Sequence, residues 1–186
     1  MSELTQQQRE FLLQIARQAV AAAAGGETPP DVETLAAAAN LPLDGTLGQN
    51  RGVFVTLTSD GHLRGCIGYI EGFKPLAQAV ADNGRSAAVA DPRFQPVQPH
   101  EVKNLEVEIS ALTPLIEVNS HKDIQVGKHG VLLEKNGRQA VFLPQVATEQ
   151  GWDLPTTLTH LALKAGLGPD QWRQGAVFRV FEAEVF

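Results

Sequence analysis

Cysteine is almost absent from this chain, since Cys66 is the only one in 186 residues. One cysteine excludes an internal disulfide and any zinc site built from cysteine ligands. Its scarcity also fits a reducing compartment, so we expect a cytoplasmic protein. The question that follows is whether Cys66 is a small buried hydrophobe or a reactive thiol.

Long apolar runs are missing as well. The Ala-rich residues 19–24 resemble part of a signal peptide, but Glu3, Arg9, Glu10 and Arg17 interrupt the hydrophobic stretch around them. No run approaches the roughly 18 apolar residues that a membrane-spanning helix needs. We therefore expect no association with a membrane.

Basic charge is in deficit, with a formal net charge of −6 and a pI near 5.3. This balance disfavours nucleic-acid binding, which needs a clustered basic surface. The chain also lacks a Walker loop, a GxGxxG turn after a strand, an HExxH helix and histidines at metal-ligand spacing. We accordingly predict no metal site and no cofactor.

Two strong turn signals predict β-hairpins. Asp60-Gly61 lies between β-rich runs within residues 52–70, and Asn136-Gly137 lies between predicted strands at 129–134 and 138–143. Further strands are expected at 105–112 and 177–186, and helices at 5–24, 32–39, 74–90, 144–150 and 155–165. The pattern predicts an α+β fold in one domain over residues 1–186, with a central, mostly antiparallel sheet flanked by helices.

The unusual stretch is LRGCIG, residues 63–68. Strict alternation assigns its residues to two faces of a strand: the core face takes Leu63, Gly65 and Ile67, and the opposite face takes Arg64, Cys66 and Gly68. A guanidinium on the same face as a thiol favours the thiolate. Two interpretations remain open: a nucleophilic Cys66 assisted by Arg64, or a buried cysteine in a tightly packed strand.

A second unusual stretch follows the helix predicted over residues 74–90. Asp91-Pro92-Arg93-Phe94 forms a rigid loop with a carboxylate and a guanidinium. One interpretation makes Asp91 and Arg93 a clamp for a polar or anionic substrate. The other is a helix end locked by an internal pair between Asp91 and Arg93.

His160 is the histidine with the most suggestive position. It lines up with Thr157 and Lys164 along one stripe of the helix predicted at 155–165, beside an apolar stripe. A neutral imidazole there suits a base or a substrate-binding acceptor. The alternative is the polar flank of an ordinary amphipathic helix.

These motifs together resemble the AmmeMemoRadiSam system protein A family, also called the AMME chromosomal region protein family. The matching segments stand in family order along most of the chain: RGVFVTL (51–57), LRGCIG (63–68), AVADPRF (88–94), LEVEISALTP (105–114), GVLLE (130–134), FLPQVA (142–147), GWD (151–153) and LALKAGL (161–167). The resemblance implies an α+β domain with a smaller subdomain and a cleft near the LRGCIG strand.

The resemblance also implies site residues and partners. By motif, the cleft residues are Arg64, Cys66, Asp91, Arg93 and Gln145. The implied partners are a Memo-type protein and a radical-SAM protein that share a pathway modifying RNA, protein or a small molecule.

The function then divides into two hypotheses. The protein is either a cysteine-dependent enzyme component of that pathway or a non-catalytic adaptor that docks on the same partners. Some relatives carry a second cysteine where this chain has Ala162, so a Cys–Cys redox couple within this chain is not expected. The reaction, the substrate and the oligomeric state are left open by the sequence.

Overall fold

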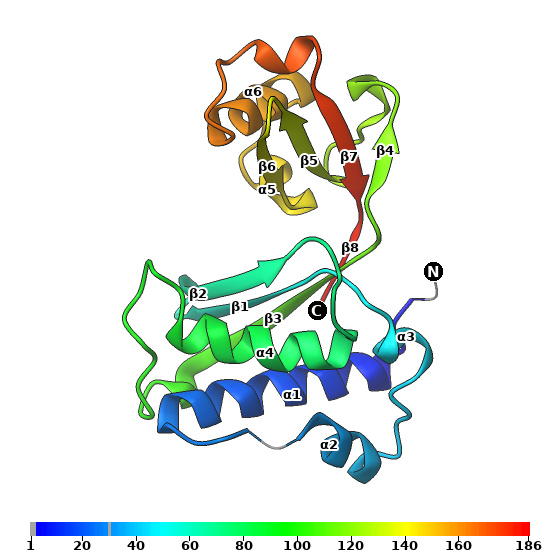
Figure 1. Ribbon diagram of the computed structural model, residues 1–186. Helices are drawn as coiled ribbons and strands as arrows, with labels where there is room; N and C mark the ends of the chain where they lie inside the picture. The colour runs from blue at the N-terminus through cyan, green and yellow to red at the C-terminus, as the bar shows by residue number, and fades with distance from the viewer. Residues whose placement is uncertain (1–2, 30) are drawn as a thin grey trace. The chain divides into compact units, whose positions relative to one another are not determined.

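The computed structural model describes residues 3–29 and 31–186. The chain forms two compact units, which are described separately below (Figure 1). Unit 1 takes the chain as far as Leu112 together with the tail Glu184–Phe186, and unit 2 is Thr113–Ala183. Both units combine helices with an antiparallel sheet, so the predicted α+β class is confirmed.

Unit 1 contains a four-stranded sheet in the order β2-β1-β3-β8. Its elements are α1 (Gln6–Gly25), α2 (Val32–Ala38), α3 (Gly45–Gly48), β1 (Val53–Ser59), β2 (His62–Tyr69), α4 (Leu76–Val89), a 3₁₀ turn at Val102–Asn104, β3 (Leu105–Leu112) and β8 (Ala183–Val185). β1 pairs with β2 on one side and with β3 on the other, and both pairings are antiparallel.

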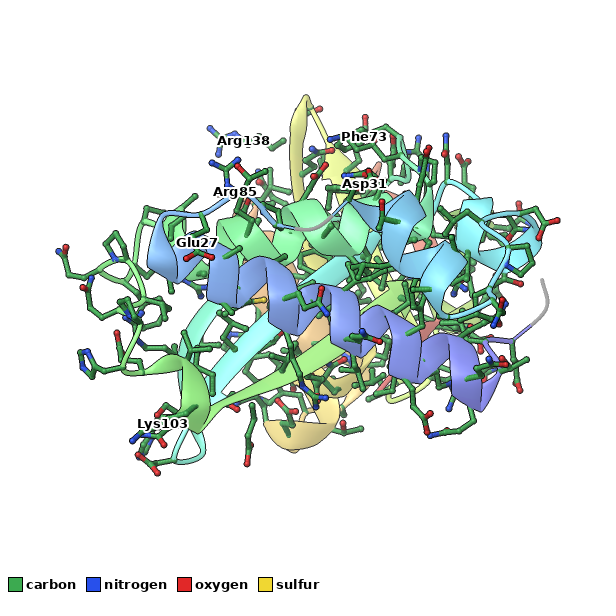
Figure 2. The ribbon with its side chains drawn as sticks, turned by 90° about the horizontal axis from the view of Figure 1, so that it is seen from below. Glu27, Asp31, Phe73, Arg85, Lys103 and Arg138 are labelled. Atoms are coloured by element: carbon green, nitrogen blue, oxygen red, sulfur yellow. The ribbon has the colours of Figure 1, made fainter. Side chains whose placement is uncertain are left out.

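The core of unit 1 lies between this sheet and two helices. α1 and α4 run side by side over one face of the sheet (Figures 1 and 2). Val53, Val55 and Leu57 alternate along β1 and are fully buried against these helices. The intervening Phe54 and Thr56 project from the opposite face, where they are partly exposed.

Local sequence signals explain where the elements begin and end. Thr5 and Gln8 form the capping box predicted for α1, and Gly26 ends the helix with φ of 71°. In the first hairpin turn, Asp60 and Gly61 both have positive φ, 51° and 76°. This backbone geometry matches the twist of the flanking strands and suits Asp-Gly, so the predicted hairpin is confirmed.

Unit 2 contains a second four-stranded sheet in the order β4-β7-β5-β6. Its elements are β4 (Ile116–Val118), a 3₁₀ turn at His121–Asp123, β5 (Gly130–Lys135), β6 (Arg138–Phe142), α5 (Pro144–Glu149), α6 (Leu154–Lys164), a 3₁₀ turn at Gln171–Arg173 and β7 (Val177–Phe181). Leu158, Leu161 and Ala162 of α6 are fully buried in its core. Asp153 caps α6 by accepting a hydrogen bond from the Thr156 N–H, as predicted.

The strands divide between two antiparallel sheets, one in each unit. One expectation about the strands was wrong. The apolar segment predicted as a single strand over residues 177–186 is interrupted at Glu182, so that β7 pairs in unit 2 and β8 joins the sheet of unit 1. The short elements α3 and β4 carried no recognised signal in the sequence.

Candidate functional site

Cys66 lies on β2, which is an edge strand of the unit 1 sheet. Its partner across the sheet is Thr56 of β1, and the Thr56 hydroxyl donates a hydrogen bond to the Cys66 sulfur at 3.3 Å. The side chain therefore occupies the face opposite α1 and α4, together with that of Thr56. Cys66 is partly exposed and does not belong to the hydrophobic core of unit 1.

The main chain of Cys66 is held from the outer edge of the sheet by the loop that follows α4. The Cys66 N–H donates to Asp91 Oδ2 at 2.9 Å, and Arg93 Nη2 donates to the Cys66 carbonyl at 3.3 Å. These side chains satisfy the peptide groups that a neighbouring strand would otherwise bind. Asp91 and Arg93 therefore close the edge of β2 at the position of the thiol.

The charge of Asp91 is balanced within this loop. The Asp91 side chain is 2% exposed, and it accepts hydrogen bonds from Arg93 Nε at 3.0 Å and from Arg93 Nη2 at 2.7 Å. The hydrogen bond from the Arg93 side chain, aided by the N–H groups of Cys66 and Arg93, holds the pKa of Asp91 well below its usual range. The internal Asp–Arg pair considered from the sequence is thus present. Arg93 is nevertheless 53% exposed, which leaves part of its guanidinium accessible.

A β-bulge changes the faces predicted for LRGCIG. Leu57 pairs with Gly65 but Thr58 pairs with Leu63, so Arg64 is an additional residue without a partner on β1. Leu63 consequently lies on the same face as Cys66 and is 43% exposed, which corrects its assignment to the core face. Because of the bulge, side chains do not alternate between the two faces of β2 at Arg64. The alternation rule therefore gives no reason to place the Arg64 side chain beside Cys66.

The side chain of Arg64 is bound to the loop over residues 95–101. Its Nε and Nη2 donate to the two carboxylate oxygens of Glu101 at 2.9 and 3.1 Å, and its Nη1 donates to the carbonyl of Gln95 at 3.0 Å. The hydrogen bond from Arg64, with a second from the Gln98 N–H, lowers the pKa of Glu101 to about 2. Arg64 therefore anchors this loop to β2, and the guanidinium that reaches the Cys66 peptide is that of Arg93.

The two glycines beside Cys66 are explained by close packing. A Cβ on Gly65 would lie 2.2 Å from the carbonyl oxygen of Ala87 in α4. A Cβ on Gly68 would lie 2.3 Å from the carbonyl oxygen of Val53 and would also overlap the ring of Phe54. Both positions exclude any larger residue because backbone atoms occupy the space.

The remaining predicted site residues, Gln145 and His160, belong to unit 2. His160 is exposed, and its ring stacks on that of Trp152 with centroids 4.1 Å apart. The amide oxygen of Gln145 is buried and has no hydrogen-bond partner in the described structure. The structure thus brings Arg64, Cys66, Asp91 and Arg93 together around one loop, whereas Gln145 and His160 lie in the other unit.

Among the described residues of unit 1, no histidine forms a hydrogen bond with Cys66. Over residues 3–29 and 31–186, no group of three or more His, Cys, Asp and Glu side chains is arranged to hold a metal ion. In the same part of the chain, no helix combines the length and the apolar composition required to cross a membrane.

Comparison with known proteins assigns the chain to a family. Residues 13–186 match the family model AMMECR1. The chain belongs to the AMMECR1 family. Among its relatives, Protein MK0488 of Methanopyrus kandleri is 40% identical, with 99% of this chain and 90% of that protein covered. Protein MJ0810 of Methanocaldococcus jannaschii is 44% identical over 74% of this chain and 73% of its own length.

A solved structure has the same fold. The crystal structure of protein PH0010 from Pyrococcus horikoshii matches with a TM-score of 0.82 and 35% sequence identity. The match covers 95% of this chain and 89% of that chain. The family named from the sequence motifs is therefore confirmed, as is the α+β fold that it implies.

Sequence reasoning missed two residues of the site in this AMMECR1 protein. Thr56 was not recognised because its contact with Cys66 depends on the register of β1 against β2. Glu101 was not recognised because it lies 37 residues from Arg64, in a segment with ordinary loop composition. An alternating strand such as β1 does signal that Thr56 faces away from the core, but not which side chain it meets.

Proposed function

We propose that this AMMECR1 protein is a cysteine-dependent component of a cytoplasmic modification pathway, in which it acts with a Memo-type protein and a radical-SAM protein. Cys66 is the reactive group, as a nucleophile or a covalent carrier. The observation that carries the proposal is a partly exposed thiol whose own peptide is fixed by Asp91 and Arg93. A fixed backbone positions the sulfur for reaction, and partial exposure admits an electrophile.

The other side chains have distinct roles in this proposal. Asp91 and Arg93 are positioning residues for Cys66, and the accessible part of the Arg93 guanidinium binds an anionic or polar group of the substrate. Arg64 acts indirectly, since it secures the loop that carries Asp91 and Arg93. The roles predicted for Gln145 and His160 in substrate binding belong to the same proposal.

Alkylation by iodoacetamide tests the reactivity of Cys66. We expect the native protein to be alkylated at Cys66 at least as fast as the urea-unfolded chain at the same pH, because the folded site exposes the sulfur and fixes its position. Cys66→Ser supplies the blank, and peptide mass mapping confirms the modified residue. Native alkylation slower than that of the unfolded chain would contradict a nucleophilic Cys66.

A specific observation also favours the adaptor hypothesis. The ion pairs Arg64–Glu101 and Asp91–Arg93 use most of the charge in the two motifs to join the loop to β2. In that case LRGCIG and DPRF form a structural joint, and Cys66 has no chemical role. Pull-down of the Memo-type and radical-SAM proteins with Cys66→Ser, together with its urea unfolding, separates the hypotheses. Reduced stability with intact binding, and unchanged activity of the reconstituted set, supports the adaptor.

A further inference from the structure

A groove of about 430 Å³ lies in unit 1, away from the Cys66 site. One side of it is formed by α1 and the other by the segment that leads into β3. Its lining residues are Arg17, Gln18, Val20, Ala21, Val102, Lys103, Leu105 and Val107. None of these residues takes part in the contacts of Cys66, Asp91, Arg93 or Arg64 described above.

The groove follows an edge of β3 that is only partly covered by β8. On this side Phe186 exchanges two hydrogen bonds with Ile109, at 2.8 and 3.1 Å. Peptide groups two residues apart point toward the same side of a strand, so those of Val107 point toward this edge too. The hydrogen bonds that the described residues make to this edge extend from Thr113 to Ile109. Among the described residues, the Val107 N–H and carbonyl therefore face no neighbouring strand on this side.

The groove has an apolar surface that suits such a strand. Leu105 and Val107 are partly buried against the unit 1 core, and the exposed Ala21 of α1 lines the groove with them. In an extended segment, every second side chain points the same way. The side chains on one face of a bound segment would therefore pack against Ala21, Leu105 and Val107.

Gln18 contributes an unsatisfied polar group to the same groove. Its amide oxygen is buried and has no hydrogen-bond partner in the described structure. Rotation about the terminal bond of this side chain lets the amide present either a donor or an acceptor. A main-chain group of a bound segment would supply the missing partner, whereas an empty groove leaves it unpaired.

The charges at the groove favour an acidic ligand. Arg17 and Lys103 both line it and both are exposed, and among the described residues neither forms an ion pair with a carboxylate. Lys103 lies in the 3₁₀ turn that precedes β3 (Figure 2). Two unpaired cations at one groove contrast with the net charge of −6 for the whole chain. Acidic side chains on a ligand would complement them.

We propose that this groove binds an extended acidic segment of a partner protein, which adds as a strand to the free edge of β3. Main-chain hydrogen bonds to Val107 and the amide of Gln18 provide affinity. Apolar residues at alternate positions pack into the groove, and the negative charge of the acidic residues between them is attracted by Arg17 and Lys103. The site takes a peptide of alternating apolar and acidic residues, independently of the chemistry at Cys66.

The direct test uses a defined peptide as the probe, acetyl-Glu-Val-Asp-Val-Glu-Val-amide, with the full chain. We expect saturable binding with a Kd below about 1 mM, measured by NMR titration of the ¹⁵N-labelled protein. The amide signals of residues 17–21 and 102–107 should shift. The cationic peptide acetyl-Lys-Val-Lys-Val-Lys-Val-amide should bind at least about tenfold more weakly. No saturation by the acidic peptide, or shifts confined to other residues, overturns the proposal.

Charge reversal identifies the groove residues. We expect Arg17→Glu combined with Lys103→Glu to weaken binding of the acidic peptide by about tenfold. The two cations that attract the peptide are replaced by two carboxylates that repel it. Arg85→Glu is the matched control: Arg85 is an exposed cation of α4 on the other side of α1 (Figure 2), and its reversal should leave the Kd unchanged. Circular dichroism confirms that each variant is folded. Equal weakening by the double variant and by the control contradicts a local site.

N-methylation of the probe tests strand addition without altering the protein. Only alternate peptide N–H groups of an added strand face β3. Two peptides methylated at odd or at even positions should therefore differ, with one losing binding and the other retaining it. Equal binding by both excludes strand pairing. A different outcome is a concentration-dependent dimer of the wild-type chain that the Arg17→Glu/Lys103→Glu variant does not form. That result would assign the groove to a second copy of this chain and would overturn the proposal that it binds a partner protein.

Discussion

Single residues in the LRGCIG segment are constrained by different neighbours. Gly65 is restricted by the backbone of α4, Cys66 by Thr56 and Asp91, and Arg64 by Glu101. These contacts separate the roles of adjacent residues. Gly65 is required for packing against α4, and Arg64 holds a loop. The presence of a cysteine at position 66 is not explained by packing.

The packing role of Gly65 predicts a large effect of one methyl group. Gly65→Ala places a Cβ 2.2 Å from the carbonyl oxygen of Ala87. The backbone of β2 or of α4 must shift to relieve this overlap. We expect a loss of about 1–3 kcal/mol in the free energy of unfolding, measured by urea denaturation. Gly25→Ala is the control, since its added Cβ meets only the Glu27 side chain at 3.7 Å. A Gly65→Ala variant as stable as this control would show that the packing is not tight.

The pair of Arg64 and Glu101 predicts a pH-dependent stability. The folded-state pKa of Glu101 is about 2, below the ordinary value of 4.5, so its contribution is complete above pH 4.5. It is lost as the pH falls toward 2, because protonation then favours the unfolded chain. We expect Glu101→Gln to be about 1 kcal/mol less stable than the wild type at pH 7 and equally stable near pH 2. Urea unfolding across this range checks the result; a difference that does not vary with pH would contradict it.

Helices and hairpins formed where the sequence carries a capping or turn signal, whereas the register of the strands depended on how they pair. The capping box fixed the start of α1, and Asp-Gly and Asn-Gly fixed both hairpin turns. The bulge at Arg64 was not predictable, because an extra residue appears only when β2 is aligned with β1. The same limit applies to Glu101, whose bond to Arg64 spans 37 residues.

The capping box of α1 can be tested directly. Thr5→Ala removes the hydroxyl that accepts from the Gln8 N–H, so an N–H in the first turn loses its partner. We expect a loss of about 1 kcal/mol in the free energy of unfolding. Thr5→Ser retains the hydroxyl and should stay close to the wild type. Equal stability of both variants would show that the cap makes no contribution.

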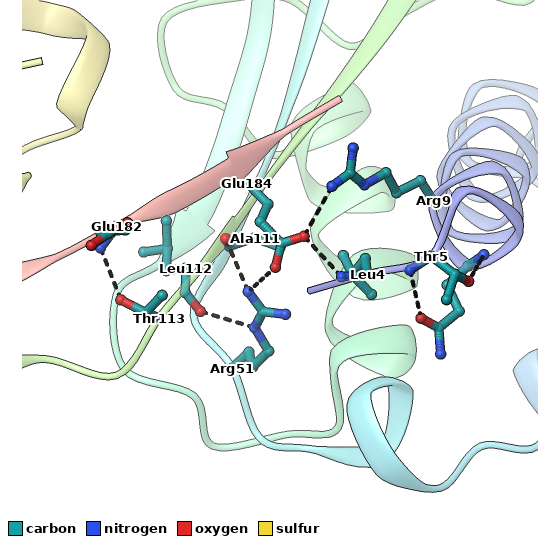
Figure 3. Close-up of polar contacts among 10 residues, drawn as sticks. Leu4, Thr5, Arg9, Arg51, Ala111, Leu112, Thr113, Glu182 and Glu184 are labelled. Carbon is teal, nitrogen blue, oxygen red and sulfur yellow. Dashed lines mark hydrogen bonds and ion pairs between the residues drawn. The ribbon is translucent and has the colours of Figure 1, made fainter. Parts of the chain in front are cut away.

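At the scale of the whole molecule, a buried arginine links distant parts of unit 1. Arg51 is 2% exposed and donates from Nε to the Leu112 carbonyl and from Nη2 to the Ala111 carbonyl and the Glu184 carboxylate (Figure 3). Glu184 also accepts from Arg9 and from the Leu4 N–H. The cluster therefore joins the last strand to α1, to β3 and to the start of β1, where the chain leaves and re-enters unit 1.

Loss of Glu184 should destabilise unit 1. Glu184→Leu leaves the buried guanidinium of Arg51 without its carboxylate, so we expect a loss of about 3 kcal/mol in the free energy of unfolding. Hydrogen exchange should rise in β8 and along the edge of β3 before it rises in β5. Arg51→Met/Glu184→Leu should cost less than the sum of the two single changes, because the pair is removed together. Strictly additive effects would show that the two residues are not coupled.

Local signals in the sequence were enough to predict the α+β class, both hairpin turns, the caps of α1 and α6 and the family, and to single out Asp91 and Arg93, which contact the Cys66 peptide. These features follow from contacts between residues close in the sequence or from the order of the motifs along the chain, which resembles that of a family. The division of the strands between two sheets, the bond from Arg64 to Glu101 and the contact of Arg93 with the Cys66 peptide became visible in the folded chain alone. Strand register and long-range ion pairs depend on which segments pack together, and local propensity does not encode that choice.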